Sequence, residues 1–246
     1  MYDQICLMTP TYKRSNTYLP RFISTAINTV YQLDRLHFMF CVNEKDVETQ
    51  EFLRDYDFGS CKHDIVLENL PEPHLAKYFN QMYAAVKAKN DDKIVVTMMG
   101  DDMEFRTQNW DTSMLDLINH YDGIGVFWAN DDYISHERCP VNLFVTQKMV
   151  DATEQPFMCE LFAGDLIDWI WGKVGKYTRT SHYESNIHIW HNHSTAKTQC
   201  HWDETFQRLY KKQQEAHQIG KGKAREIAAQ IADVLRSKGM TGESIC

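Results

Sequence analysis

Through the first half of the chain, short apolar runs alternate with stretches whose apolar residues recur at helical spacing. The apolar runs at 2–9, 37–42 and 93–98 are expected to be strands, and the stretches at 16–30 and 74–89 are expected to be helices. Strands that alternate with helices are typical of βαβ units. The alternation therefore predicts an α/β fold in which helices flank a mostly parallel sheet.

Later segments continue the pattern less regularly. The first helix is expected to be capped by Ser15 or Asn16. Further expected elements are the strands 123–129, 143–146 and 187–190 and the helix 161–171. A charged, helical sequence then replaces an aromatic, His-rich one, which predicts a main domain over 1–203 and a helical C-terminal extension over 204–246.

Length and composition fit one large α/β domain with an appended helical segment, since the chain has 246 residues and 43% of them are hydrophobic. Neither a membrane-spanning apolar run of roughly 18 residues nor a basic N-terminal region of the secretory type is evident. The seven cysteines are odd in number and lack C-x-x-C spacing. This usage is typical of a reducing compartment, so a cytoplasmic location is expected.

Charge is distributed unevenly along the chain. The net charge is −8, which gives no general attraction to nucleic acid. Between Phe206 and Lys238, however, the sequence has eight basic and three acidic residues, so the charge of this tail is +5 and that of the rest of the chain is −13. The tail is interpreted either as a solvated helix face or as a surface for an anionic partner.

Two adjacent carboxylates, Asp101 and Asp102, follow the buried strand expected at 93–98. Gly100 offers a tight turn before them, and Glu104 comes close behind. In open α/β sheets, ligands bind at the carboxyl ends of the strands. Carboxylates at that edge can hold a hard divalent cation, which in turn neutralises a diphosphate. The alternative is a solvated acidic turn.

Polar motifs occur at several other positions where strands or helices are expected to end or begin. The first is Thr-Pro-Thr-Tyr-Lys-Arg at 9–14, and Asn43-Glu44 follows the second strand. Asp165 follows Gly164 at an expected helix start, and His191 and His193 follow the last strand. In their order and spacing, these features resemble the nucleotide-sugar glycosyltransferases of the GT-A fold, family 2 in particular, over roughly residues 3–195.

The resemblance implies a GT-A-like fold and transfer of a sugar from a nucleotide-diphosphate donor to a hydroxyl, with a UDP-sugar as the expected donor. It implies Mn²⁺ or Mg²⁺ as the cofactor, with Asp102 and His191 or His193 as metal ligands. The residues implied in donor binding are Thr9, Pro10, Tyr12, Arg14, Asn43, Lys77 and Asp101.

Two positions depart from the family pattern. Gly100 stands where the first Asp of the family's D-x-D motif is found, so a side-chain contact is missing there. Lys13 replaces the more common Asn, which leaves the contact at that position open. Asp101 is assigned to the ribose or to a supporting role, and Asp102 to the metal.

The chemistry implied needs a cation and a base. A divalent ion bridging both phosphates acts as a Lewis acid on the leaving group. A carboxylate near the acceptor hydroxyl acts as general base, for which Asp165 is the candidate. Asp165 has an alternative role as a helix cap. If Asp165 is the base, the reaction inverts the anomeric centre.

Alternatives remain open for the acceptor and for the class of protein. Small phage transferases that modify DNA bases look similar in outline. With such a DNA acceptor, the basic tail would contact phosphates, and a phage-encoded chain would be located in the host cytoplasm. A glycan, lipid-linked or protein acceptor is the other possibility. A nucleotidylyltransferase would need a Gly-rich loop after the first strand, and 9–14 contains no Gly. A non-catalytic nucleotide-sugar binding module would keep the metal acids.

Two other side-chain groups have more than one interpretation. Four tryptophans can stack on a sugar or base or belong to the core. They are Trp128, Trp169, Trp171 and Trp190. A group of histidines and one cysteine permits a small zinc site, although its spacing fits no common zinc pattern. That group is His188, His191, His193, Cys200 and His201.

Overall fold

The structure is a computed structural model that describes residues 1–71, 74–89, 93–132, 142–154, 156–158, 164–191 and 222–242, with only the backbone path for 164–168. One sheet runs through it, with strand order β3-β2-β1-β4-β7-β6-β8-β5. The strands are β1 (Gln4–Thr11), β2 (Leu36–Asn43), β3 (Lys62–Glu68), β4 (Ile94–Met98), β5 (Met103–Phe105), β6 (Val126–Asn130), β7 (Phe144–Thr146) and β8 (Ser181–His191).

Helices connect most of these strands. They are α1 (Tyr18–Thr29), the short 3-10 helix η1 (Leu33–Arg35), α2 (Val47–Asp55), α3 (Leu75–Lys87), α4 (Trp110–His120), α5 (Gln147–Ala152), α6 (Gly164–Thr178) and a helix over 222–237. Strands β3, β2, β1 and β4 are mutually parallel, and β6 is parallel to β8. The predicted α/β fold with a mostly parallel sheet is therefore confirmed, and β7 and β5 are its antiparallel strands.

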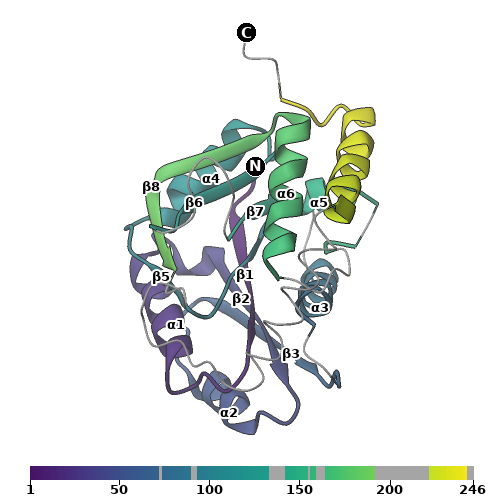
Figure 1. Ribbon diagram of the computed structural model, residues 1–246. Helices are drawn as coiled ribbons and strands as arrows, with labels where there is room; N and C mark the ends of the chain where they lie inside the picture. The colour runs from purple at the N-terminus through teal and green to yellow at the C-terminus, as the bar shows by residue number, and fades with distance from the viewer. Residues whose placement is uncertain are drawn as a thin grey trace.

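The sheet is covered on both faces, which explains why its central strands read as unbroken apolar runs. Alternate residues of β1 belong to different cores. Cys6 and Met8 pack with α3, α5, α6 and the helix over 222–237, whereas Ile5 and Leu7 pack with α1, α2 and α4. In Figure 1 the first group of helices lies to the right of the sheet, and α1 and α2 lie at the lower left.

The helix over 222–237 is part of the main core. Ala224, Ala228 and Leu235 are fully buried in the same apolar cluster as α3 and α6. Just beyond the helix, the Lys238 ammonium donates to the Ala152 carbonyl at 2.8 Å. This helix is therefore attached to the sheet domain, while the predicted division between 203 and 204 stays a prediction because 192–221 lie outside the described residues.

Several expected boundaries differ from those observed. Helix α1 begins at Tyr18 without a side-chain cap, so the predicted capping by Ser15 or Asn16 is wrong. Both of those side chains donate instead to Glu48 of α2. Strand β8 begins six residues before the expected 187, because its polar first half pairs with β6, and β5 was not anticipated.

Over the described residues, the structure has no helix with both the length and the apolar surface that crossing a lipid bilayer requires.

Candidate functional site

The N-terminal motif and the acidic turn meet at the carboxyl ends of β1 and β4. These strands are parallel neighbours, with Met8 opposite Met98, so the residues that follow them emerge at one edge. The Thr11 hydroxyl donates to an Asp101 carboxylate oxygen at 2.7 Å. The Arg14 guanidinium lies 3.9 Å from the other oxygen of the same carboxylate. The sequence prediction that these two motifs lie together is confirmed by these contacts.

Burial makes the Asp101 carboxyl a weak acid. Loss of water contact is the largest influence, and it raises the pKa of Asp101 from 3.8 to about 6. The charge of Arg14 and the hydrogen bond from Thr11 act in the opposite direction, while the neighbouring Asp102 carboxylate adds to the rise. Asp101 therefore changes its charge just below neutral pH.

This pKa predicts a pH-dependent contribution to stability. Between about pH 4 and pH 6, folded Asp101 keeps a proton that the unfolded chain has released, so stability falls as the pH rises through this window. Compared with an Asp101→Asn variant, the wild type should lose roughly 2–3 kcal/mol of unfolding free energy across it. Urea unfolding at several pH values measures the difference. Parallel pH profiles for the two proteins would contradict the prediction.

Asp102 faces His191 across the β5–β8 pair. Antiparallel pairing sets Met103 opposite His191, which brings an Asp102 oxygen to 3.5 Å from the His191 Nε2. Both side chains are partly exposed. One carboxylate oxygen and one imidazole nitrogen at this separation suit a shared divalent cation, and imidazole favours Mn²⁺ over Mg²⁺. The described residues hold no group of three or more His, Cys, Asp or Glu side chains that could bind a metal, so the remaining positions would fall to substrate oxygens, water and His193, which lies outside the described residues.

The geometry of Asp102 gives a reason for the departure at Gly100. A Cβ atom at residue 100 would lie 2.4 Å from an Asp102 carboxylate oxygen, which is closer than such atoms approach. A side chain there would make the Asp102 carboxylate shift from its observed position. The glycine leaves room for Asp102 where it faces His191, and Asp101 is the acid that faces Thr11 and Arg14.

The loop that carries Arg14 is held by a residue that sequence reasoning missed. Lys13 adopts a positive φ of 53°, a conformation that non-glycine residues rarely take. Its backbone N–H donates to Asp46 at 2.6 Å, and the same carboxylate accepts from the Thr49 N–H at the start of α2. Asp46 thus links two loops at the sheet edge. Its spacing from Thr49 was a capping signal in the sequence, but its contact with Lys13 had none.

The predicted donor-binding residues of the N-terminal motif differ in how far they are exposed. Thr9 is fully buried within β1, so its role at a donor stays a prediction. Thr11, two residues on, makes the contact with Asp101. Pro10 precedes it in β1, and Tyr12 is 47% exposed at the strand end.

Two more predicted residues come from β2 and α3. The Asn43 amide donates to Glu68 at 2.7 Å, and its oxygen accepts from the Lys45 N–H, so Asn43 organises the loops after β2 and β3. Lys77 is partly exposed on α3. Among the described residues, neither Asn43 nor Lys77 forms a hydrogen bond or ion pair with Asp101. Their roles in donor binding stay predictions.

The remaining predicted residues are described less fully. Asp165 lies in the first turn of α6. Figure 1 shows α6 running opposite to β1, so this turn points toward the end of the molecule where β1 finishes. His193 and the rest of the possible zinc group beyond His191 fall outside the described residues. Of the four tryptophans, Trp128 and Trp171 are buried, whereas Trp169 and Trp190 are partly exposed.

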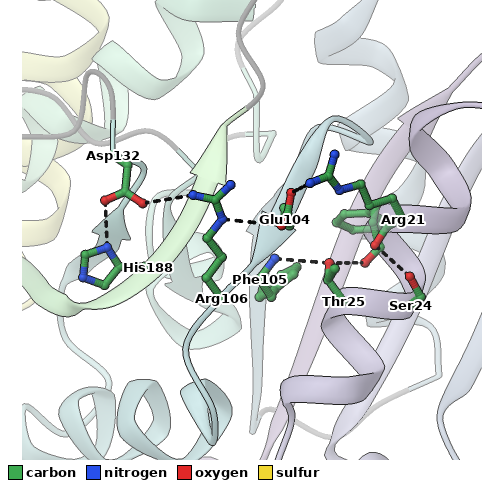
Figure 2. Close-up of polar contacts among 9 residues, drawn as sticks. Arg21, Ser24, Thr25, Glu104, Phe105, Arg106, Asp132 and His188 are labelled. Carbon is green, nitrogen blue, oxygen red and sulfur yellow. Dashed lines mark hydrogen bonds and ion pairs between the residues drawn. The ribbon is translucent and has the colours of Figure 1, made fainter. Parts of the chain in front are cut away.

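Contrary to expectation, Glu104 does not lie with the carboxylates assigned to the metal site. Its carboxylate contacts Arg21 of α1 on one side, and on the other it lies 3.5 Å from the Arg106 Nε. Arg106 also reaches Asp132, whose other oxygen lies 2.7 Å from the His188 Nδ1. Figure 2 shows these five side chains in one continuous row. The physical reason is strand alternation. His191 shares a face with its partner Met103, and Glu104 turns to the opposite face.

No protein-family model and no curated protein sequence matches the chain. Solved structures do. The TarS fragment 1–349 of S. aureus has a TM-score of 0.60 and 10% identity over 95% of this chain and 72% of that one. Its complex with UDP-GlcNAc has a TM-score of 0.58 and 9% identity, with 95% and 73% covered.

A mannosyltransferase from Pyrobaculum calidifontis, solved with GDP-Man and Mn²⁺, is similarly close. Its TM-score is 0.58 at 10% identity, and the match covers 99% of this chain and 77% of the mannosyltransferase. At such identities a likeness establishes the fold and leaves activity to be argued from the site. The chain has the GT-A-type fold of the nucleotide-sugar glycosyltransferases.

Proposed function

We propose that this protein is a metal-dependent glycosyltransferase that moves a sugar from a nucleotide-diphosphate donor to an acceptor hydroxyl. The observation that carries the proposal is the edge where Thr11, Arg14 and Asp101 meet beside the Asp102–His191 pair. Open α/β sheets bind ligands at the carboxyl ends of their parallel strands. This edge lies at the carboxyl ends of the parallel strands β1 and β4.

Each residue of this edge has a role in the proposal. Asp101, when ionised, accepts hydrogen bonds from the donor ribose, and Arg14 and Thr11 fix its orientation. Tyr12 offers an exposed ring to the base, and Lys77 offers a cation to the diphosphate. Asp165 takes the proton of the acceptor hydroxyl, which gives inversion at the anomeric carbon.

Asp102 and His191 would hold the Mn²⁺ or Mg²⁺ ion, with His193 as a further candidate. Bound there, the ion supplies Lewis-acid neutralisation of the diphosphate leaving group. The partial exposure of both described ligands leaves room for substrate oxygens. Two protein ligands with substrate phosphates completing the shell is a common arrangement for these ions.

The donor is best tested by thermal shift. A UDP-sugar with Mn²⁺ at about 100 times its Kd should stabilise the protein by roughly 2.7 kcal/mol. For a chain of this size, that corresponds to a rise in Tm of roughly 5–10 °C. We expect UDP-sugars to outperform GDP-sugars and the shift to vanish with EDTA. A larger shift with GDP-mannose would show that the donor carries guanine and not uracil. The absence of any metal-dependent shift would contradict the proposed donor site.

The two other classes of protein differ in measurable ways. A nucleotidylyltransferase would release pyrophosphate from a nucleoside triphosphate, whereas a glycosyltransferase without acceptor slowly hydrolyses its nucleotide sugar. A binding module would bind the nucleotide sugar and do neither. The loop at 9–14 lacks the glycines with which a phosphate-cradling loop approaches a triphosphate, so we place transfer first.

A DNA acceptor has less support from the described part of the basic tail. The Arg236 guanidinium donates to the Tyr177 carbonyl and contacts Asp233, and Lys238 bonds Ala152 and Glu154. These cations therefore attach their segment to the domain. Arg208, Lys211, Lys212 and Lys221 lie outside the described residues, so DNA is retained as the competing acceptor in the experiment below.

A further inference from the structure

The β5–β8 pair carries an unusual set of side chains on its solvent side. Residues directly opposite in an antiparallel pair share a face, and Glu104 stands opposite Trp190. Their strand neighbours Phe105 and Ile189 are buried on the other face. The solvent side, named here the outer β5–β8 face, consists of Glu104, Arg106, His188 and Trp190.

Two guanidinium groups lie near the Trp190 ring. The Arg106 Cζ is 4.3 Å from its centroid, and the Arg21 Cζ, which comes from α1, is 5.8 Å away. Glu104 contacts both arginines, and Asp132 joins Arg106 to His188 (Figure 2). These contacts hold long side chains in defined positions around a partly exposed aromatic ring. Such an arrangement lowers the entropic cost of binding a ligand there.

The charges of this face are balanced. Two guanidiniums are matched by two carboxylates, with separations of 3.9 Å or less between partners. Little net field is left to attract a polyanion, because each cation already has a carboxylate close by. Unused N–H groups of the arginines and lone pairs of the carboxylates still offer many donors and acceptors. The face therefore suits a neutral ligand that is rich in hydroxyl groups.

This face adjoins the proposed reaction site. Trp190 directly precedes His191, and Glu104 is two residues after Asp102. An acceptor must bring its hydroxyl to the anomeric carbon, which is bonded to the diphosphate that Asp102 and His191 would hold through the metal. Successive strand residues turn to opposite sides, so a molecule on the outer β5–β8 face reaches the Asp102–His191 pair around the end of β8, which finishes at His191.

We infer that the outer β5–β8 face binds the acceptor, and that this acceptor is a neutral carbohydrate. The part of the Trp190 ring that Arg106 leaves uncovered packs against the C–H face of a sugar, and Arg21, Arg106, Asp132 and His188 bond its hydroxyls. The inference rests on the proposed function and deepens it by naming the acceptor class. It also separates a glycan acceptor from DNA, which would bind through unpaired cations and lose affinity steeply with salt.

Binding of the protein to an array of neutral oligosaccharides, in the presence of UDP and Mn²⁺, tests the inference. The wild type should bind a subset of them with little dependence on salt. Trp190→Ala should weaken that binding about tenfold or more, and Trp190→Phe should keep much of it, because a smaller aromatic ring remains. Arg106→Gln serves as a second variant, since its half-exposed side chain is not needed in the core.

Tyr31→Ala is the matched control, because Tyr31 is a 63% exposed aromatic residue that follows α1. It should leave oligosaccharide binding unchanged. Hydrolysis of a UDP-sugar without acceptor should stay within about threefold of wild type in all four variants, which reports that the donor site and the fold are intact.

Three results would overturn the inference. One is oligosaccharide binding that survives both Trp190→Ala and Arg106→Gln. Another is a wild-type protein that binds UDP but none of the neutral oligosaccharides. The third is salt-sensitive binding to a DNA duplex in their place. Failure of the proposed function itself looks different, because UDP-sugars would then neither bind nor be hydrolysed by any variant.

Discussion

An Asp165→Asn variant is expected to lose roughly 10²–10⁴-fold in turnover, because an amide cannot take the proton of the acceptor hydroxyl. Its affinity for the donor should stay close to that of the wild type, because the proposed base acts on the acceptor hydroxyl. The expected pattern is a large fall in kcat with little change in the donor KM. Steady-state kinetics with the preferred donor and acceptor measure both quantities.

Asp168→Asn provides the matched control, since it makes the same chemical change one helical turn later in α6. We expect it to retain turnover within about threefold. If Asp168→Asn is the variant that loses turnover, the base has been assigned to the wrong carboxylate. If neither variant does, the proposed role for the start of α6 is lost and the stereochemistry of the reaction is open.

An Asp102→Asn variant is expected to lose roughly 10³-fold in kcat/KM at limiting metal. Neutralising the carboxylate that faces His191 removes the only charged ligand that we assign to the ion. A Lewis acid is worth several kcal/mol of transition-state stabilisation, and each 1.36 kcal/mol is a factor of ten in rate. Titration with Mn²⁺, followed by both activity and the paramagnetic signal of the free ion, measures the loss in affinity and in rate.

Excess Mn²⁺ should restore part of the activity of Asp102→Asn, because a weakened site still binds at high concentration. Asp116→Asn, on the exposed surface of α4, is the control with the same change in charge and should behave like the wild type. Equal metal dependence in all three proteins would show that Asp102 has another role.

The parallel half of the sheet could be predicted because its chemistry is local. Each central strand is buried on both faces, so runs such as 37–42 and 93–98 stand out as apolar, and the helices between them keep a regular stripe. Parallel pairing then places the strand ends together, which is why Thr11 and Asp101 were expected at one edge.

The mixed half of the sheet, from β7 to β5, was harder for physical reasons. Strand β5 has three residues and exists through its pairing with β8, some 85 residues later in the chain. The first half of β8 is polar and partly exposed, with no alternation of buried and exposed residues, so its sequence carries no strand signal. The row from Arg21 to His188 joins four separate segments, and no spacing in the sequence indicates such contacts.

The expected end of the first strand, at Thr9, was wrong for a different reason. The motif at 9–14 was taken as a strand end that turns, but β1 continues to Thr11. Moving the end of the strand by two residues takes Thr9 into the core and brings Thr11 to the edge. Strand ends are the least certain part of a sequence-based assignment, and at this site two residues decide which hydroxyl meets the carboxylate.

The position of the helix over 222–237 has a consequence for biosynthesis. It covers the face of the sheet to which β1, the first strand of the chain, turns Cys6 and Met8. While the C-terminal segment is still inside the ribosome, that face of the emerging sheet lacks one of its covering helices. The early strands can pair during synthesis, but packing on this side is completed only after residues 222–237 have left the ribosome.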